Sequence, residues 1–239
     1  HRGYISESTP LAGSSAGAIA VAAHACRVDA KTALSASIRI SKQCNPFFVA
    51  AGQLMPSLQK ELDNILDVNA HEIVNERQGM VGLAHYEIFP ANKPRLQTKF
   101  ESRESLIDAI CDSSMFPYFT SNRPWRVVKR KNKMLPRVVV DGIFTEPIWR
   151  MGCPSFHQSL VDRTICISVA PIAVKQPTDL IQNTDRNNII CPELQITNAV
   201  GQLTQLGLMA TTSSTAESLK DLYDSGWADA ERWIEKEEK

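Results

Sequence analysis

The chain has 239 residues, of which 43% are hydrophobic and 22% charged, values typical of a globular protein and not of a disordered, collagenous or coiled-coil chain. Its 26 Lys and Arg residues balance 26 Asp and Glu residues, so no net charge attracts the protein to nucleic acid. The longest nearly apolar stretch, residues 16–26, is too short for a membrane-spanning helix, which needs about 20 apolar residues. No signal peptide is visible, and the six cysteines lack zinc-type spacing. These features predict a cytoplasmic or peripheral membrane location, without a metal or another cofactor.

Short apolar runs and helical periodicity alternate along the chain. In chain order we expect a strand at 9–12, helices at 16–27 and 30–42, a helix opened by Pro56, a strand at 80–89, a helix at 103–111, strands at 137–140 and 164–169, and a helical segment from about residue 193. Strands separated by helices favour an α/β fold, with a mainly parallel sheet covered by helices on both faces. Residues 1–239 are expected to form a single domain, with 193–239 as its helical C-terminal part and 175–188 as a surface loop.

The strongest local signal is Gly13-Ser14-Ser15-Ala16-Gly17, a G-x-S-x-G sequence between a predicted strand and a predicted helix. A sharp strand-to-helix turn strains the backbone of its central serine, and we expect Gly13 and Gly17 to avoid clashes there. The free N–H groups at the start of the helix, Ala16 first, can bind an oxyanion. The alternative is a turn of small residues that only packs a helix on a sheet. The strand before the motif and the helix after it favour Ser15 as a nucleophile.

A nucleophilic serine needs a general base. Asp141 follows the predicted strand 137–140, and the carboxyl ends of parallel strands are where such sites form. The alternative for Asp141 is an ordinary Asp-Gly turn with Gly142. Of the five histidines, only His157 follows Asp141, as a Ser–Asp–His order requires, but no motif surrounds it. As a candidate base, Asp141 is therefore preferred to His157, which stays open, while the residues alone leave a base and an ordinary turn as equal interpretations of Asp141.

The two motifs, in this order, resemble those of the patatin-like phospholipase family. That family uses G-x-S-x-G at a nucleophile elbow and an Asp followed by Gly, with no histidine; residues 13–18 match the first motif and Asp141-Gly142 the second. The stretches 111–119 and 218–230 resemble further parts of the family pattern, so the resemblance spans nearly the whole chain. It implies a patatin-like three-layer fold. It also implies that Ser15, activated by Asp141, cleaves the carboxylic esters of phospholipids or acylglycerols through an acyl-enzyme.

The sequence departs from the family pattern at two places. Ile143 stands where the family usually has Gly or Ala, so its branched side chain is expected to narrow the site or shift the base. The family's glycine-rich oxyanion loop is missing, since Gly3 is the only glycine before Gly13. We expect this loop and its strand to lie upstream of His1, so that the domain is N-terminally incomplete and this fragment is weakly active.

By resemblance, the expected partners are a lipid substrate and a peripheral membrane or lipid-droplet surface. Two alternatives stay open: a histidine-triad esterase that uses His157, and a weakly catalytic lipid-binding or regulatory patatin-like protein. Six basic residues between Arg126 and Arg137 form either a patch for an anionic membrane or, as we favour, the solvated tip of a hairpin.

Overall fold

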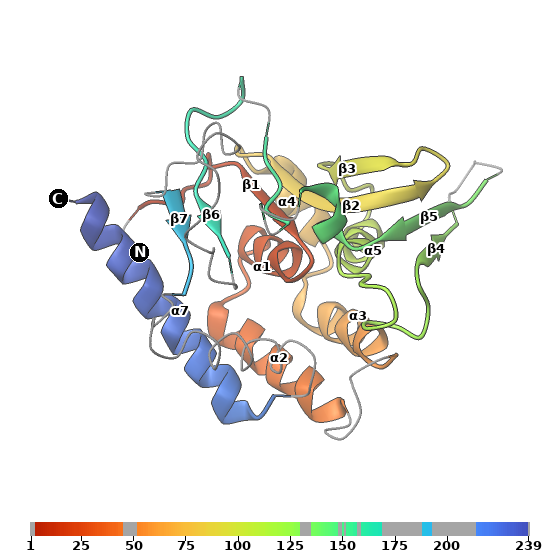
Figure 1. The fold of residues 1–239 in the computed structure, drawn as a ribbon, viewed down its shortest axis with the longest axis horizontal. Coiled ribbons are helices and arrows are strands. Elements are labelled where there is room, and N and C mark those ends of the chain that lie inside the picture. The colour runs from red at the N-terminus through yellow and green to blue at the C-terminus, as the bar shows by residue number, and fades with distance from the viewer. Residues whose placement is uncertain are drawn as a thin grey trace.

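The computed structural model describes residues 3–44, 52–129, 135–147, 150, 152–156, 159–168, 188–192 and 214–238. Helices and strands are interspersed along the chain (Figure 1). The helices are α1 (Ala16–Ala25), α2 (Ala30–Gln43), α3 (Leu54–Ile65), α4 (Ala70–Glu76), α5 (Arg103–Ser113) and α7 (Ala216–Glu237), with a 3-10 turn, η1 (Gly142–Thr145). The strands are β1 (Leu11–Ser14), β2 (Val81–Phe89), β3 (Lys93–Gln97), β4 (Arg126–Val128), β5 (Arg137–Val140), β6 (Cys166–Ile167) and β7 (Ile189–Ile190).

The main sheet is mixed, which confirms the α/β class but corrects the expectation of a mainly parallel sheet. β1 runs parallel to β2, whereas β2 pairs antiparallel with β3 and β5, and β5 pairs antiparallel with β4. β6 and β7 form a separate parallel pair. The short connection between β2 and β3 explains part of the difference, because strands joined by a few residues can only be antiparallel. Asn92 in this connection has a φ of 46°, as a residue of a tight hairpin turn often does.

β2 organises the centre of the sheet. One of its edges pairs with β3 along residues 83–87. Its other edge is shared, since β1 pairs with residues 81–84 and β5 with residues 86–89. β1 and β5 run in opposite directions, so they approach one another along the same edge of β2. Their carboxyl ends therefore meet beside the middle of β2, near His85.

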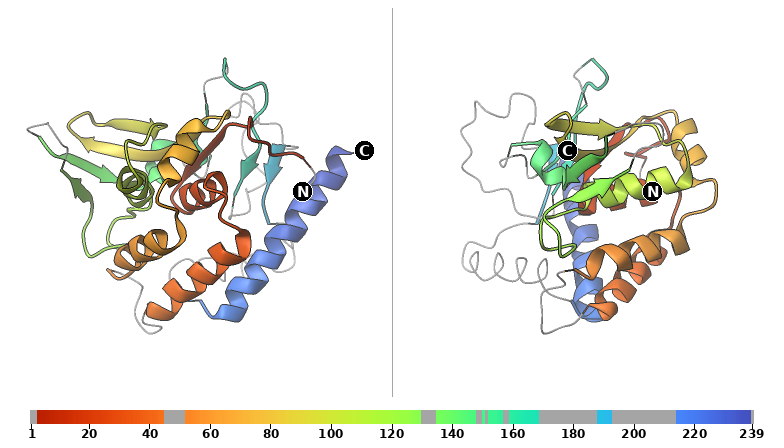
Figure 2. Two further views of the ribbon diagram at one scale, coloured as in Figure 1. Left: turned by 180° about the vertical axis from the view of Figure 1, so that it is seen from behind. Right: turned by 90° about the vertical axis from the view of Figure 1, so that its right-hand side faces the viewer.

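The hydrophobic core lies against one face of β2. Val81 and Leu83 belong to a buried cluster with side chains from α1, α3, α4 and α5, whereas the alternate residues Gly82 and Ala84 do not. α3 also packs on α2, and α2 packs on α7, which runs along the side of the molecule (Figures 1 and 2). In the described part of the chain, the helices thus form one connected packing. The expected helical cover of both faces, and with it the patatin-like three-layer arrangement, is not confirmed.

A buried ion-pair network attaches α5 to the β4–β5 pair. Asp112 of α5 is fully buried, and its carboxylate pairs with Arg126 of β4 and Arg137 of β5. Two of the six basic residues between 126 and 137 are therefore structural. The antiparallel pairing of β4 and β5 agrees with the predicted hairpin. Arg130, Lys131 and Lys133 lie outside the described residues.

Most predicted elements are present with shifted ends. β1 extends to Ser14, α3 begins before Pro56, and the predicted strand 164–169 is reduced to β6, with Val169 outside the described residues. Of the predicted C-terminal helical segment, α7 is described and residues 193–213 are not. The sequence did not predict β3. None of the helices in the described part of the chain has the length and apolar character needed to cross a bilayer.

Candidate active site

Ser15 lies on a sharp turn between β1 and α1, as the sequence predicts. Its φ of 52° and ψ of −125° place it in a left-handed region that non-glycine residues seldom occupy. Such a conformation costs about 1–3 kcal/mol and persists only where the surroundings hold it. The turn therefore stores strain at the residue that carries the candidate nucleophile.

The two glycines of the motif differ in what they do. A Cβ added to Gly13 would lie 2.3 Å from the carbonyl oxygen of Gly17 and 2.7 Å from the nitrogen of Ala18, so Gly13 is required for the close approach of strand and helix. A Cβ added to Gly17 would meet no atom within 4 Å outside the backbone of its own helix. The expectation that both glycines avoid a clash is correct for Gly13 and wrong for Gly17.

The hydroxyl of Ser15 donates a hydrogen bond to Oδ2 of Asp141 over 2.9 Å. Asp141 has no exposed surface, and its Oδ1 accepts a hydrogen bond from the N–H of Ile143 at 2.8 Å. Both carboxylate oxygens are thus held, and one faces the serine in a geometry suited to proton transfer. Ile143 is 37% exposed and contacts the Asp141 carboxylate through its N–H, and Asp141 still lies within hydrogen-bond distance of Ser15.

The proximity of Ser15 and Asp141 was predicted, but for a reason that the structure corrects. The two residues do not follow neighbouring parallel strands; they follow β1 and β5, which meet end to end along β2. Gly142 fits this junction tightly, since a Cβ there would lie 2.3 Å from the carbonyl oxygen of Ala84 and 2.7 Å from the Cβ of Ser14. The glycine after Asp141 is therefore a requirement of packing between the two strand ends.

Burial raises the pKa of Asp141 to about 6, although the hydrogen bonds from the Ile143 N–H and the Ser15 hydroxyl oppose this shift. A general base is most effective when its pKa lies near the working pH. At pH 7 a carboxyl group with this pKa is about nine-tenths ionised. Asp141 is therefore mostly ionised at neutral pH and, as a stronger base than an exposed aspartate, accepts a proton more readily.

The start of α1 offers free hydrogen-bond donors beside Ser15. Ala16 and Gly17 are exposed, and no described residue accepts a hydrogen bond from the N–H of either. The N–H of Ser15 itself is occupied, because it donates to the Oγ of Ser113 at 3.0 Å and to the carbonyl oxygen of Ser113 at 3.2 Å. The predicted oxyanion donor, Ala16, is thus available together with Gly17. The sequence gives no signal for Ser113 beyond its place in the stretch 111–119 that resembles part of the family pattern.

The described histidines do not contact the serine. His24 is exposed on α1, His71 lies on α4, and His85 is buried on β2; none of these three bonds to Ser15. No described residue pairs with either ring nitrogen of His85, and burial, with a smaller effect from Arg137 and Arg95, lowers its pKa to about 3. His85 is therefore a neutral core residue. His157, on which the histidine-triad alternative depends, lies outside the described residues.

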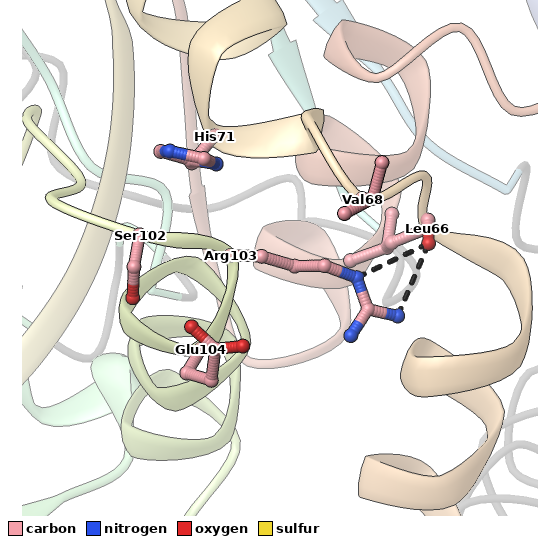
Figure 3. Close-up of a pocket in the computed structure, with 6 residues that line it drawn as sticks. All are labelled: Leu66, Val68, His71, Ser102, Arg103 and Glu104. Atoms are coloured by element: carbon pink, nitrogen blue, oxygen red, sulfur yellow. Dashed lines mark hydrogen bonds between the residues drawn. The ribbon is translucent and has the colours of Figure 1, made fainter.

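Two cavities differ in their relation to Ser15. A groove of about 1090 Å³ begins at Ala16 and continues between α1, α2, α3 and α7; its apolar lining includes Ile19, Ala20, Leu58, Leu62, Leu219 and Leu222. A smaller pocket of about 350 Å³ lies at the first turn of α5 (Figure 3). There Arg103 is fully engaged by the carbonyl oxygens of Leu66, Asp67 and Asp63 and by the Asp63 carboxylate. Of these two, the groove includes Ala16, the residue that follows Ser15, although neither Ser15 nor Asp141 lines it.

Comparisons of the chain with family models, curated proteins and solved structures find no match. Within the described ranges, no group of three or more His, Cys, Asp and Glu residues could hold a metal ion. The chemistry assigned to the site therefore depends on the geometry of Ser15, Asp141 and their neighbours.

Proposed function

We propose that the protein is a lipid acyl hydrolase that cleaves carboxylic esters with Ser15 as the nucleophile and Asp141 as the general base. The observation that carries the proposal is the 2.9 Å hydrogen bond from the strained Ser15 to the buried carboxylate of Asp141. The same pair of residues carries the resemblance to patatin-like phospholipases. A turn that only packed a helix on a sheet would need neither the strained serine nor the carboxylate.

In the first half of the reaction, Ser15 Oγ attacks the ester carbonyl while Asp141 accepts the hydroxyl proton. Negative charge moves to the carbonyl oxygen, and the N–H groups of Ala16 and Gly17 stabilise it at the start of α1. When the intermediate collapses, the bond to the alcohol breaks and Asp141 returns the proton to the leaving oxygen. The products are an acyl-Ser15 ester and a free alcohol.

In the second half, water replaces the alcohol. Asp141 accepts a proton from the water molecule, whose oxygen attacks the acyl carbon of Ser15. The new intermediate collapses to a fatty acid and the proton returns to Ser15 Oγ. Each proton taken by Asp141 is given back within the same half-reaction, so the carboxylate is regenerated.

The apolar groove that ends at Ala16 supports a lipid substrate, because it offers a hydrocarbon chain a place that reaches the residue after Ser15. Phe116 and Phe144 support an active site that faces a lipid surface. They stack with ring centroids 5.7 Å apart, are 40% and 47% exposed, and Phe144 lies three residues after Asp141. We propose that the enzyme works at a peripheral membrane or lipid-droplet surface on the cytoplasmic side.

The proposal is tested by labelling with a fluorophosphonate and by hydrolysis of p-nitrophenyl esters and phospholipid vesicles. We expect Ser15→Ala to abolish labelling and both Ser15→Ala and Asp141→Asn to lower kcat by about 10³-fold or more. The kcat of His157→Ala should stay within about twofold of the wild-type value, because the proposed Ser15–Asp141 dyad needs no histidine.

Other outcomes identify the alternatives. A large loss of turnover in His157→Ala would support the histidine-triad esterase. A wild-type chain that binds the vesicles but neither reacts with the fluorophosphonate nor hydrolyses an ester would support the lipid-binding or regulatory alternative.

A further inference from the structure

One short segment holds the backbone of both members of the dyad. Ser113 accepts the N–H of Ser15 through its Oγ at 3.0 Å and its carbonyl oxygen at 3.2 Å. The hydroxyl of Ser114 donates to the carbonyl oxygen of Ser15 at 3.4 Å. The carbonyl oxygen of Met115 accepts the N–H of Asp141 at 2.9 Å. We call these three consecutive residues at the end of α5, 113–115, the dyad clip.

The dyad clip holds the backbone of Ser15 in a conformation that is otherwise unfavourable. The left-handed φ of Ser15 is unfavourable for a residue with a side chain, so other contacts must hold it. Ser15 also lies just beyond β1, where β-sheet pairing no longer fixes the backbone. The dyad clip supplies partners for both the N–H and the carbonyl oxygen of this residue.

The dyad clip is itself firmly anchored. Ser113, Ser114 and Met115 are 0%, 4% and 2% exposed. The residue before them, Asp112, is held by Arg126 and Arg137, so the end of α5 is tied to β4 and β5. Because β5 leads directly to Asp141, the same anchor controls both the dyad clip and the base.

We infer that the dyad clip positions Ser15 and Asp141 relative to one another during the reaction, with Ser113 as its main positioning residue. This inference rests on the proposed function. Ser113 does not touch the substrate or give up a proton; it keeps the Ser15 hydroxyl aimed at the carboxylate. Loosening it should therefore slow the chemical step and leave substrate binding nearly unchanged.

The test uses the chain with Ser113→Ala and measures hydrolysis of p-nitrophenyl butyrate across pH. The variant is expected to fold, since the carbonyl oxygen of Ser113 remains as an acceptor for the Ser15 N–H. Ser102→Ala is the matched control. Ser102 caps the opposite end of α5, where its Oγ accepts the N–H of Ser105 at 3.2 Å, so the same substitution removes a similar hydrogen bond far from the dyad. Ser113→Cys, with a weak acceptor of similar shape, carries the test should the Ala variant not fold.

We expect Ser113→Ala to lower kcat by about 10- to 100-fold with KM within about twofold, and Ser113→Cys to fall between this variant and the wild type. The acid limb of the pH–rate profile should also move to higher pH. A misplaced Ser15 no longer donates well to Asp141, and that hydrogen bond lowers the pKa of the carboxyl group. Ser102→Ala should lower the melting temperature but leave kcat and the acid limb unchanged.

Ser15→Ala in the same assay separates failure of this inference from failure of the proposed function. If Ser15→Ala is inactive while Ser113→Ala and Ser113→Cys keep wild-type kcat and an unmoved acid limb, the positioning role is overturned and the proposed function stands. If Ser15→Ala keeps wild-type turnover, or the wild type neither hydrolyses nor labels, the proposed function fails and the inference fails with it.

Discussion

Asp141 serves the proposed chemistry at the expense of stability. A fully buried carboxylate has lost its hydration, and among the described residues two hydrogen bonds, from Ser15 and Ile143, replace it. No cation of the described residues pairs with it, whereas the equally buried Asp112 has two arginine partners. The absence of a described cation partner suits the proton exchange proposed for Asp141, whereas the two arginine partners of Asp112 hold α5 to β4 and β5.

The first prediction concerns stability. The pKa of about 6 for Asp141 lies above the ordinary value of 3.8, so the folded chain binds this proton more tightly than the unfolded chain. The group therefore contributes stability below pH 3.8 that is lost as pH rises through 6, at most about 3 kcal/mol by pH 8. We expect Asp141→Asn to melt higher than the wild type at pH 8, with a gain that disappears near pH 4. Ser15→Ala, also inactive, should show no such gain in thermal melts.

The second prediction concerns the pH dependence of turnover. If Asp141 is the base, kcat/KM should rise with pH through a single ionisation near 6 and then stay level through neutral pH. A steady-state series with a soluble ester measures the profile. If the wild type hydrolyses the ester but its kcat/KM does not rise with pH near 6, Asp141 is excluded as the titrating base.

At the scale of elements, the elbow depends on how closely β1 and α1 approach. Gly13 lies where a Cβ would overlap the backbone of Gly17, and backbone atoms cannot move aside as a flexible side chain can. α1 can start directly at Ala16 because its first residues are small. The turn and the helix thus need one glycine for space, while the second contributes only its exposed N–H.

The third prediction contrasts these two glycines. Gly13→Ala should cost more than about 2 kcal/mol of unfolding free energy and reduce turnover, because the added methyl group forces the strand and helix apart. Gly17→Ala should be neutral or raise stability by up to about 1 kcal/mol, since Ala favours a helix. Denaturant unfolding of both variants measures the difference. Equal destabilisation of the two would contradict the packing described for the elbow.

For the molecule as a whole, the centre of the sheet contains a neutral histidine. His85 is 1% exposed on β2, beside the junction of β1 and β5, and its pKa is lowered to about 3 from 6.5. The unfolded chain binds this proton more readily than the folded chain. The contribution of His85 to stability is therefore present above pH 6.5 and is lost as pH falls toward 3.

The fourth prediction concerns the acid sensitivity that His85 contributes. Below pH 6.5 this group lowers the free energy of unfolding by as much as about 1.4 kcal/mol per pH unit, whereas the proton bound by Asp141 raises it between pH 6 and 3.8 and offsets much of the loss. We expect His85→Leu to remove the loss, so that its stability in urea titrations rises relative to the wild type as pH falls from 7 to 4. His24→Leu, on the exposed side of α1, should keep the wild-type slope. An unchanged slope in His85→Leu would show that His85 is not responsible for the acid sensitivity.

The local features of this protein could be predicted from the order of its residues. The strand, Ser15 and the helix after it follow from the spacing of small residues, and the strand before Asp141 follows from a β-branched run, because neighbouring residues alone decide such signals. Only the tertiary structure decided that β1 and β5 meet end to end on β2, and that Ser113 contacts a residue 98 positions away. β3, with Pro94 and little apolar alternation, gives no strand signal, yet it forms because β2 supplies a partner edge. Strand direction and pairing depend on such long-range contacts, so the sequence predicted that Ser15 and Asp141 belong to one site while the fold determined how they come together.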